Sequence, residues 1–303
     1  MQSARAKRVI VFLALAYGFA WTVGFGFFAL GGQLNSAAFV AIGLLYMSAP
    51  ALAALLTQRF IWKEPWPDLG LRMPSLRWFA VAWLGPILLV ILVLGLSLLL
   101  PGISLATGLD GFLAALADIM PPPKVAEVQR QLAPTILAKP GVLLLVSFVQ
   151  ALIAGPTINA VAAFGEEFGW RGFLLHQLSA LGFWRSSWLI GFFWGVWHLP
   201  VIVNGHNYPG HPLIGSLMMT LLTMLLSPLI GYVRLRAQSV FAAAIFHGTF
   251  NAAATLAIFL NGGTALLVGV TGLVGLLTLF FADVVLWLHL RRHLVVLDNR
   301  VRE

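Results

Sequence analysis

The chain has 303 residues, of which 60% are hydrophobic and only 9% are charged. A soluble globular domain has about 25% charged residues, so this composition excludes a soluble enzyme of useful size and indicates a membrane protein with several spans. The net charge of +8 does not indicate nucleic-acid binding, because the basic residues lie in short segments between apolar runs. The absence of cysteine excludes disulfides and thiolate metal sites.

Eight stretches of the chain are long and apolar enough to cross a bilayer, which requires about 20 residues each. The first follows a basic N-terminus and is longer than the core of a signal peptide, so we expect it to be retained. The expected spans are residues 9–30, 37–56, 78–100, 142–163, 187–203, 213–233, 240–260 and 265–288. We therefore predict an all-α, polytopic transmembrane helical bundle of about eight spans, forming a single integral membrane domain over residues 1–303.

The segments between these spans are short, except for residues 102–140. Three consecutive prolines at 121–123 cannot propagate a helix, and we expect a short surface helix after them at 124–137. We expect residues 171–181 to lie along the membrane interface. The loop at 204–212 is polar, and we expect its two histidines, His206 and His211, to be solvated.

The basic residues also predict an orientation. With the N-terminus in the cytoplasm, fourteen of the 18 Lys and Arg residues fall on cytoplasmic segments and three on the opposite side, while Arg171 lies beside a span. Positive charge collects on the cytoplasmic side of membrane proteins, so we predict that both termini are cytoplasmic. We expect the membrane to be that of a bacterial cell, with lipid as the surrounding partner.

The most unusual stretch is residues 164–171, where Glu166, Glu167 and Arg171 interrupt an apolar sequence. A charge at the centre of a membrane helix costs about 2.5–3.5 kcal/mol, so such residues usually have a function. Glu167 and Arg171 are i,i+4 on a helix and are predicted to pair. Glu166 points about 100° away and lacks this partner. A salt-bridged helix end at the membrane surface is the structural alternative.

Two later spans each add a pair of polar or aromatic residues with i,i+4 spacing. Trp194 and His198 share one helix face, as do His247 and Asn251, and Gly248 allows another backbone to approach closely. Each pair alone is compatible with a structural histidine or with an interhelical hydrogen bond worth about 0.6 kcal/mol. Polar groups within spans normally face the bundle interior, so we expect the three motifs to converge on one polar pocket.

These residue types suit the hydrolysis of a peptide bond. A carboxylate in a dry site can act as a general base on water, an imidazole can position that water, and His and Asn donors can hold a developing oxyanion. Two histidines and a carboxylate are also a common zinc-ligand set. The residue inventory therefore leaves both a metal-free and a metal-dependent mechanism open.

The order and spacing of the three motifs resemble the CAAX protease and bacteriocin-processing family, also called type II CAAX prenyl endopeptidase-like proteins. The resemblance covers roughly residues 140–260, which would form the catalytic core, and the first four spans carry no comparable motif. It rests on the patterns EExxxR, aromatic-x-x-x-His and His-x-x-x-Asn. Trp194 departs from the phenylalanine most often found there, and we expect its packing role to be retained.

The resemblance implies a role for each motif residue. Glu166 would activate the attacking water, His198 would help to position it, and His247 and Asn251 would form the oxyanion site. Glu167 and Arg171 would orient the motif helix. The family is regarded as metal-independent, which implies no cofactor, with zinc as the alternative.

The implied activity is that of an intramembrane endopeptidase. It would hydrolyse a bond near the C-terminus of a membrane-associated protein or peptide, prenylated or not. Two other classes stay open: a non-catalytic immunity or scaffold protein, and a transporter or lipid-binding channel. Polar residues threaded along several spans would favour a transporter, whereas here they cluster in the second half.

Two further polar residues lie outside the motifs. Asp283 falls within the last expected span, and we expect it to be a structural hydrogen-bond or ion-pair partner. His176 lies on the expected interfacial segment, and we expect it to be structural.

Overall fold

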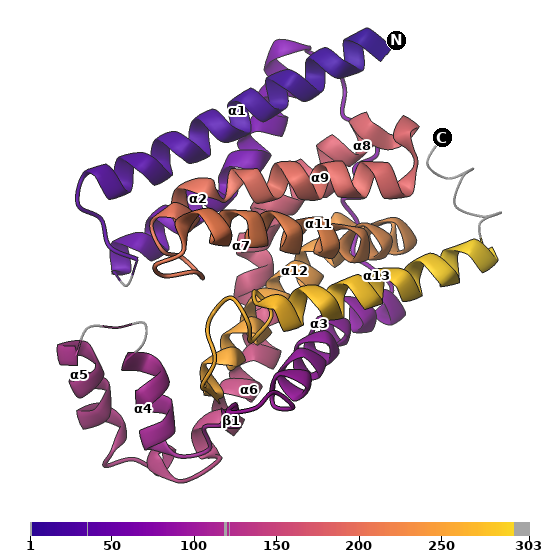
Figure 1. The fold of residues 1–303 in the computed structure, drawn as a ribbon. Coiled ribbons are helices and arrows are strands. Elements are labelled where there is room, and N and C mark those ends of the chain that lie inside the picture. The colour runs from indigo at the N-terminus through magenta and orange to yellow at the C-terminus, as the bar shows by residue number, and fades with distance from the viewer. Residues whose placement is uncertain (1, 35, 118–119, 121, 294–303) are drawn as a thin grey trace.

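The computed structural model describes residues 2–34, 36–117, 120 and 122–293, which are mostly helical and have almost no strand (Figure 1). Within these residues, seven helices are long and apolar enough to cross a membrane. The predicted all-α, polytopic membrane bundle is therefore confirmed.

The structure sets the following bounds. The α-helices are α1 (Gln2–Ala29), α2 (Ala37–Leu55), α3 (Leu76–Ser97), α4 (Leu109–Ala117), α5 (Pro122–Leu132), α6 (Val142–Ala154), α7 (Ala160–Glu167), α8 (Leu175–Leu178), α9 (Phe183–Trp197), α10 (Leu199–Val203), α11 (Pro212–Ala237), α12 (Val240–Ala254) and α13 (Leu273–His293). Wider π-helical turns are η1 (Leu56–Ile61), η3 (Gly155–Asn159) and η4 (Phe168–Leu174), and 3₁₀ turns are η2 (Ile136–Ala138), η5 (Ser179–Leu181) and η6 (Thr255–Phe259). Strands β1 (Ser104–Leu105) and β2 (Leu260–Asn261) pair antiparallel.

The predicted fourth span is the first part of a continuous helical segment, Val142–Leu181, of 40 residues. Within the segment 171–181, which was expected along the membrane interface, Arg171 to Leu175 are buried inside the bundle. Burial of Arg171 is possible because its charge is paired within the same helix. At Gly155 and Pro156 the helix widens into the π turn η3, one of the local adjustments by which a membrane helix accommodates a proline.

The predicted fifth span, residues 187–203, is split at His198 into α9 and α10. Pro200 has no N–H with which to continue the α-helical ladder, so the chain turns just before it. The two helices together still have about the length that a crossing needs. With this broken crossing, the start of α1 and the end of α13 lie on the same side of the bundle (Figure 1).

The last span differs from the prediction at its beginning. Residues 264–272 form turns, with Gly269 at a positive φ of 73°, and α13 begins at Leu273 rather than at 265. Arg291 and Arg292, which follow the expected end of the span at residue 288, continue this helix. Residues 294–303 lie outside the described residues.

The long segment between the third and fourth spans contains two helices, α4 and α5, which form a hairpin beside the bundle (Figure 1). Helix α5 starts at Pro122, two residues before the expected surface helix, because proline is tolerated in a first helical turn. Pro121 lies outside the described residues. The ring of Phe112 in α4 stacks on Phe259 at 5.4 Å, which joins the hairpin to the end of η6.

The loop before α11 is more firmly packed than its polar sequence suggests. Tyr208 is fully buried, and its hydroxyl donates to the carbonyl of Thr271 at 2.8 Å. His206 packs against Phe39 with ring centroids 5.9 Å apart, so the prediction that it is solvated is wrong. His211 is exposed as expected.

This packing predicts that the loop loosens in acid. Burial lowers the pKa of His206, whereas the exposed side chain titrates near about 6.5. The folded loop favours the neutral ring, so stability present above about pH 6.5 is lost as the pH falls below that value. We expect the protection factors of the amides in residues 204–211, which correct for the slower intrinsic exchange at low pH, to be lower at pH 5 than at pH 7.5. His206→Gln should remove this difference, and equal protection of the wild-type loop at both pH values would contradict it.

Candidate active site

Helix α7, which carries the two glutamates, is held between α12 and α2 by close backbone contacts. A Cβ added to Gly248 in α12 would lie 2.4 Å from the backbone nitrogen of Ala160. On the opposite side, a Cβ added to Gly165 would lie 2.8 Å from the carbonyl oxygen of Met47 in α2. The expectation that Gly248 allows a close backbone approach is confirmed, and α7 is fixed on both sides.

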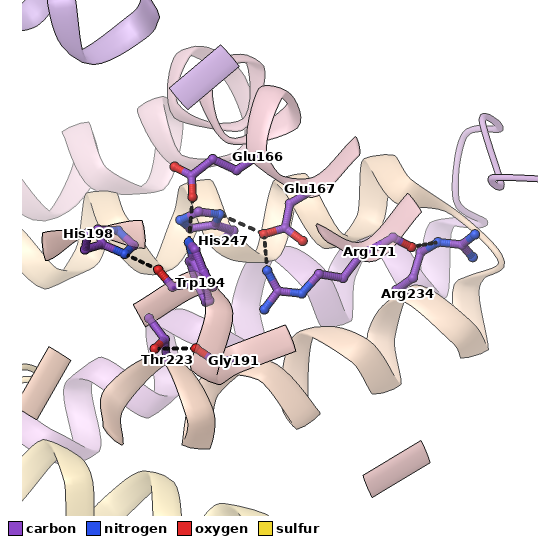
Figure 2. A network of polar contacts seen from close by, with 9 residues as sticks. All are labelled: Glu166, Glu167, Arg171, Gly191, Trp194, His198, Thr223, Arg234 and His247. Atoms are coloured by element: carbon purple, nitrogen blue, oxygen red, sulfur yellow. Dashed lines mark hydrogen bonds and ion pairs between the residues drawn. The ribbon is translucent and has the colours of Figure 1, made fainter. Parts of the chain in front are cut away.

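Helix α9 is positioned by its own pair of glycines. Added Cβ atoms at Gly191 and Gly195 would lie 2.5 Å from the Cα atoms of Met224 and Thr220 in α11. The hydroxyl of Thr223 also donates to the Gly191 carbonyl at 2.9 Å (Figure 2). With α9 fixed against α11, Trp194 is buried and its indole reaches α7.

Glu167 is the centre of a buried ion-pair network (Figure 2). Its Oε1 accepts from Arg171 Nη1 at 2.8 Å, which confirms the predicted i,i+4 pair. The same oxygen lies 2.9 Å from His247 Nδ1 on α12. Arg171 is also connected to helix α11, because its carbonyl accepts from Arg234 Nε at 3.2 Å. Glu167 thus orients both the motif helix and one of the candidate catalytic histidines.

Glu166 is buried but does not join this ion pair. Its Oε2 accepts from the indole Nε1 of Trp194 at 2.6 Å, and within the described residues its other oxygen accepts no hydrogen bond. The carboxylate is therefore anchored at one oxygen and has lone pairs left for a water molecule. The expected packing role of Trp194 is present, but its function as a hydrogen-bond donor was not predicted.

Both histidines are held through Nδ1. His198 Nδ1 lies 2.8 Å from the carbonyl of Trp194, and a carbonyl can only accept, so this nitrogen carries the proton. His247 Nδ1 faces the Glu167 carboxylate and is a donor by the same reasoning. Within the described residues, neither Nε2 atom has a hydrogen-bond partner, so both are available to a substrate or water.

The break between α9 and α10 is stabilised by side chains from the first two helices. The carbonyl of Trp197 accepts from the Tyr46 hydroxyl and from Trp21 Nε1, the latter at 3.2 Å. One turn earlier, the Tyr17 hydroxyl donates to the carbonyl of Phe193 at 2.8 Å. Sequence analysis missed these residues, because a tyrosine or tryptophan in a span gives no signal of what it contacts.

Removing the Tyr46 hydroxyl should destabilise the turn that carries His198. We expect Tyr46→Phe to cost about 0.5–1.5 kcal/mol, the usual contribution of one hydrogen bond, and to lower the melting temperature measurably. Tyr17→Phe removes the same group from a donor farther from His198, and we expect it to affect peptide cleavage less. Equal loss of cleavage in the two variants would argue against a specific role for Tyr46.

The structure brings six of the seven predicted site residues together: Glu166, Glu167, Arg171, Trp194, His198 and His247. Asn251 lies one turn beyond His247 on α12; it is exposed and makes no hydrogen bond within the described residues.

Asp283 and His176 lie outside the three motifs, and both were expected to be structural. Asp283 is buried with neither oxygen hydrogen-bonded in the described residues, so its expected structural pairing is wrong. His176 is exposed.

The possible metal-ligand set does not assemble. No group of three or more His, Asp or Glu side chains in the described part of the chain is arranged to hold a metal ion. As placed, these side chains do not assemble the zinc set, although the Nδ1 contacts of His198 and His247 to a carbonyl and a carboxylate leave both Nε2 atoms able to bind a metal. A mechanism without metal stays a proposal.

Comparison with known proteins finds a family model that matches the part of the chain carrying this site. Residues 144–253 match the family model described as type II CAAX prenyl endopeptidase Rce1-like. A CAAX prenyl protease 2 of Methanococcus maripaludis is 41% identical over 49 residues, which are 16% of this chain and 18% of that relative. The resemblance suggested by the motifs is confirmed over residues 144–253, and together with the apolar helices it identifies an integral membrane protein.

Proposed function

We propose, from this match and from the arrangement of the site, that the chain is an intramembrane endopeptidase of the CAAX prenyl protease type. The observation that supports it most is Glu166: a buried carboxylate with one oxygen anchored and the other without a partner among the residues that the structure describes. Two histidines with unengaged Nε2 atoms belong to the same network. Such a set provides a base, a positioning group and a donor, which amide hydrolysis requires.

In the proposed mechanism, Glu166 removes a proton from a water molecule that His198 Nε2 helps to orient. The water oxygen then bonds to the scissile carbonyl carbon. When the C–N bond breaks, the proton held by Glu166 passes to the leaving amine nitrogen. The carboxylate is thereby restored, and protons and electrons balance over the cycle.

The carbonyl oxygen becomes negative in the intermediate and needs donors. His247 can donate from Nε2 while Nδ1 donates to Glu167 only if its ring carries both protons. Glu167 supplies the negative charge that such an imidazolium needs beside it. We assign the second donor to the amide of Asn251, which follows His247 by one helical turn.

The proposed substrate is a membrane-associated protein or peptide cleaved near its C-terminus. The relative named above is a prenyl protease, which makes a prenylated C-terminal tetrapeptide the first candidate. The positive-inside pattern supports cytoplasmic termini and presentation of the substrate from that side. The motif-bearing core would be residues 140–260, with the remaining helices supporting it.

The test uses purified protein in liposomes and quenched fluorescent peptides that end in farnesylated or plain tetrapeptides. We expect cleavage that persists in a strong chelator and is missing from a Glu166→Gln preparation, which controls for contaminating proteases. Cleavage lost to the chelator and restored by zinc would overturn the metal-free mechanism. No cleavage of either peptide class would favour an immunity or scaffold protein.

A further inference from the structure

We infer that Trp194 is a positioning residue: its indole N–H orients the Glu166 carboxylate, and its carbonyl orients His198. The inference rests on the proposed role of Glu166 as the base. It goes further by assigning the alignment of the base and of the water-positioning histidine to a single residue.

The first observation is the contact between the indole and the carboxylate. Trp194 Nε1 lies 2.6 Å from Glu166 Oε2, and both side chains are only 2% exposed. Hydrogen bonds to a charged acceptor are shorter and stronger than neutral ones, and this bond is short. Since Trp194 is the only donor to Glu166 in the described residues, it alone determines which oxygen is left for water.

The second observation is the cation on the face of the same ring. The guanidinium carbon of Arg171 lies 4.4 Å from the centroid of Trp194, within the distance of a cation–π interaction. Arg171 is fixed there by Glu167 and makes no hydrogen bond to Glu166 in the described residues. A positive charge over the indole draws electron density from the ring and strengthens its N–H as a donor. The ion pair thereby acts on Glu166 through Trp194.

The third observation is that the main chain of the same residue holds His198. The Trp194 carbonyl accepts from His198 Nδ1 at 2.8 Å, which leaves Nε2 as the nitrogen that faces a substrate. The ring of Trp194 also meets His247 edge to face, with centroids 5.0 Å apart at 74°. Movement of Trp194 would therefore displace the base and both histidines together.

If Trp194 served only to pack the core, its indole nitrogen would not be required for activity. Trp194→Phe keeps an aromatic ring but removes the donor, so we expect the variant to fold and its kcat to fall about tenfold or more, in line with the strength of a hydrogen bond to a charged group. The KM should change much less, because the lost contact is to the base rather than to the peptide. Without its donor the carboxylate form is less favoured, so the acid limb of the kcat/KM profile should move to higher pH.

The neighbouring Trp197 provides a matched control. It is equally buried, its ring lies 4.9 Å from that of His198, and its Nε1 has no hydrogen-bond partner in the described residues. Trp197→Phe removes the same atoms without removing a donor to Glu166, so its acid limb should stay in place. The other charged or titratable groups around Glu166 are unchanged in both variants; they are Glu167, Arg171, His198, His247 and Tyr46.

A measurement without substrate separates this inference from the proposed function. In protein labelled with ¹⁵N-tryptophan, the indole proton of Trp194, assigned by its absence from Trp194→Phe, should resonate downfield and move upfield in Glu166→Ala. A resonance that does not move would show that the hydrogen bond is not formed. Equal pH profiles for the Trp194 and Trp197 variants would overturn the positioning role even if the bond is present. Wild-type protein that cleaves nothing, with the resonance shift intact, would overturn the proposed function and not the contact.

Discussion

Replacing Glu166 by glutamine should abolish peptide cleavage and leave the protein folded in its membrane. The glutamine carbonyl can still accept from Trp194, so the packing and the hydrogen bond in the core are retained. An amide cannot take a proton from water, however. Loss of a positioned general base typically lowers the rate by about 10²–10⁴-fold, so we expect cleavage to fall to background.

The control for this variant is Glu127→Gln. Glu127 is an exposed glutamate on α5, where its carboxylate accepts from Gln131 at 3.3 Å, and the substitution removes the same charge away from the site. Both proteins should elute as one monodisperse peak and melt within a few degrees of wild type. Normal turnover by Glu166→Gln would show that Glu166 is not the general base. The proposed mechanism would then have no group to activate the water.

Introducing leucine at Gly248 should prevent folding altogether. Even the first added carbon would lie 2.4 Å from the nitrogen of Ala160 and 2.6 Å from the carbonyl carbon of Asn159, and both are backbone atoms that cannot rotate away. Helix α7 cannot retreat, because Gly165 fixes it against α2 on its other side. Overpacking a core typically costs about 1–3 kcal/mol and more where the backbone must move, so we expect a loss beyond the stability of the bundle.

A matched glycine separates this steric effect from the general cost of a larger residue in a span. Gly95 also lies within a membrane helix, α3, and an added Cβ there would meet nothing within 4 Å. Gly95→Leu should yield protein with a melting temperature close to wild type, whereas Gly248→Leu should yield aggregates in fluorescence-detected size-exclusion chromatography. A folded, active Gly248→Leu protein would show that the α7–α12 contact is looser than described.

Local chemistry in the sequence was enough to predict the fold class and the Glu167–Arg171 pair. Both depend on features within one helix: the length of an apolar run and the i,i+4 spacing. The links from Glu167 to His247 and from Glu166 to Trp194 join residues 80 and 28 positions apart. No spacing rule reaches that far, because tertiary packing decides which side chains meet.

The errors have physical causes of the same kind. Counting apolar residues placed one straight span at 187–203, because hydropathy does not register the missing N–H of Pro200. Residues 171–181 were expected along the membrane interface, yet Arg171, paired with Glu167, is buried inside the bundle. The exposed position of Asn251 could not be predicted from the sequence, because Asn251 shares a helix face with His247, which is buried.

The ion pair between Glu167 and Arg171 has a consequence for how the protein is made. Both residues belong to one helix, four positions apart, so the partner is present as soon as that segment leaves the ribosome. His247, the other group bound to Glu167, is synthesised much later, 80 residues further along the chain. In the interval the nascent helix enters the lipid with its own counter-charge. Insertion of this helix into the membrane therefore does not depend on the later synthesis of α12, which carries His247 and completes the site.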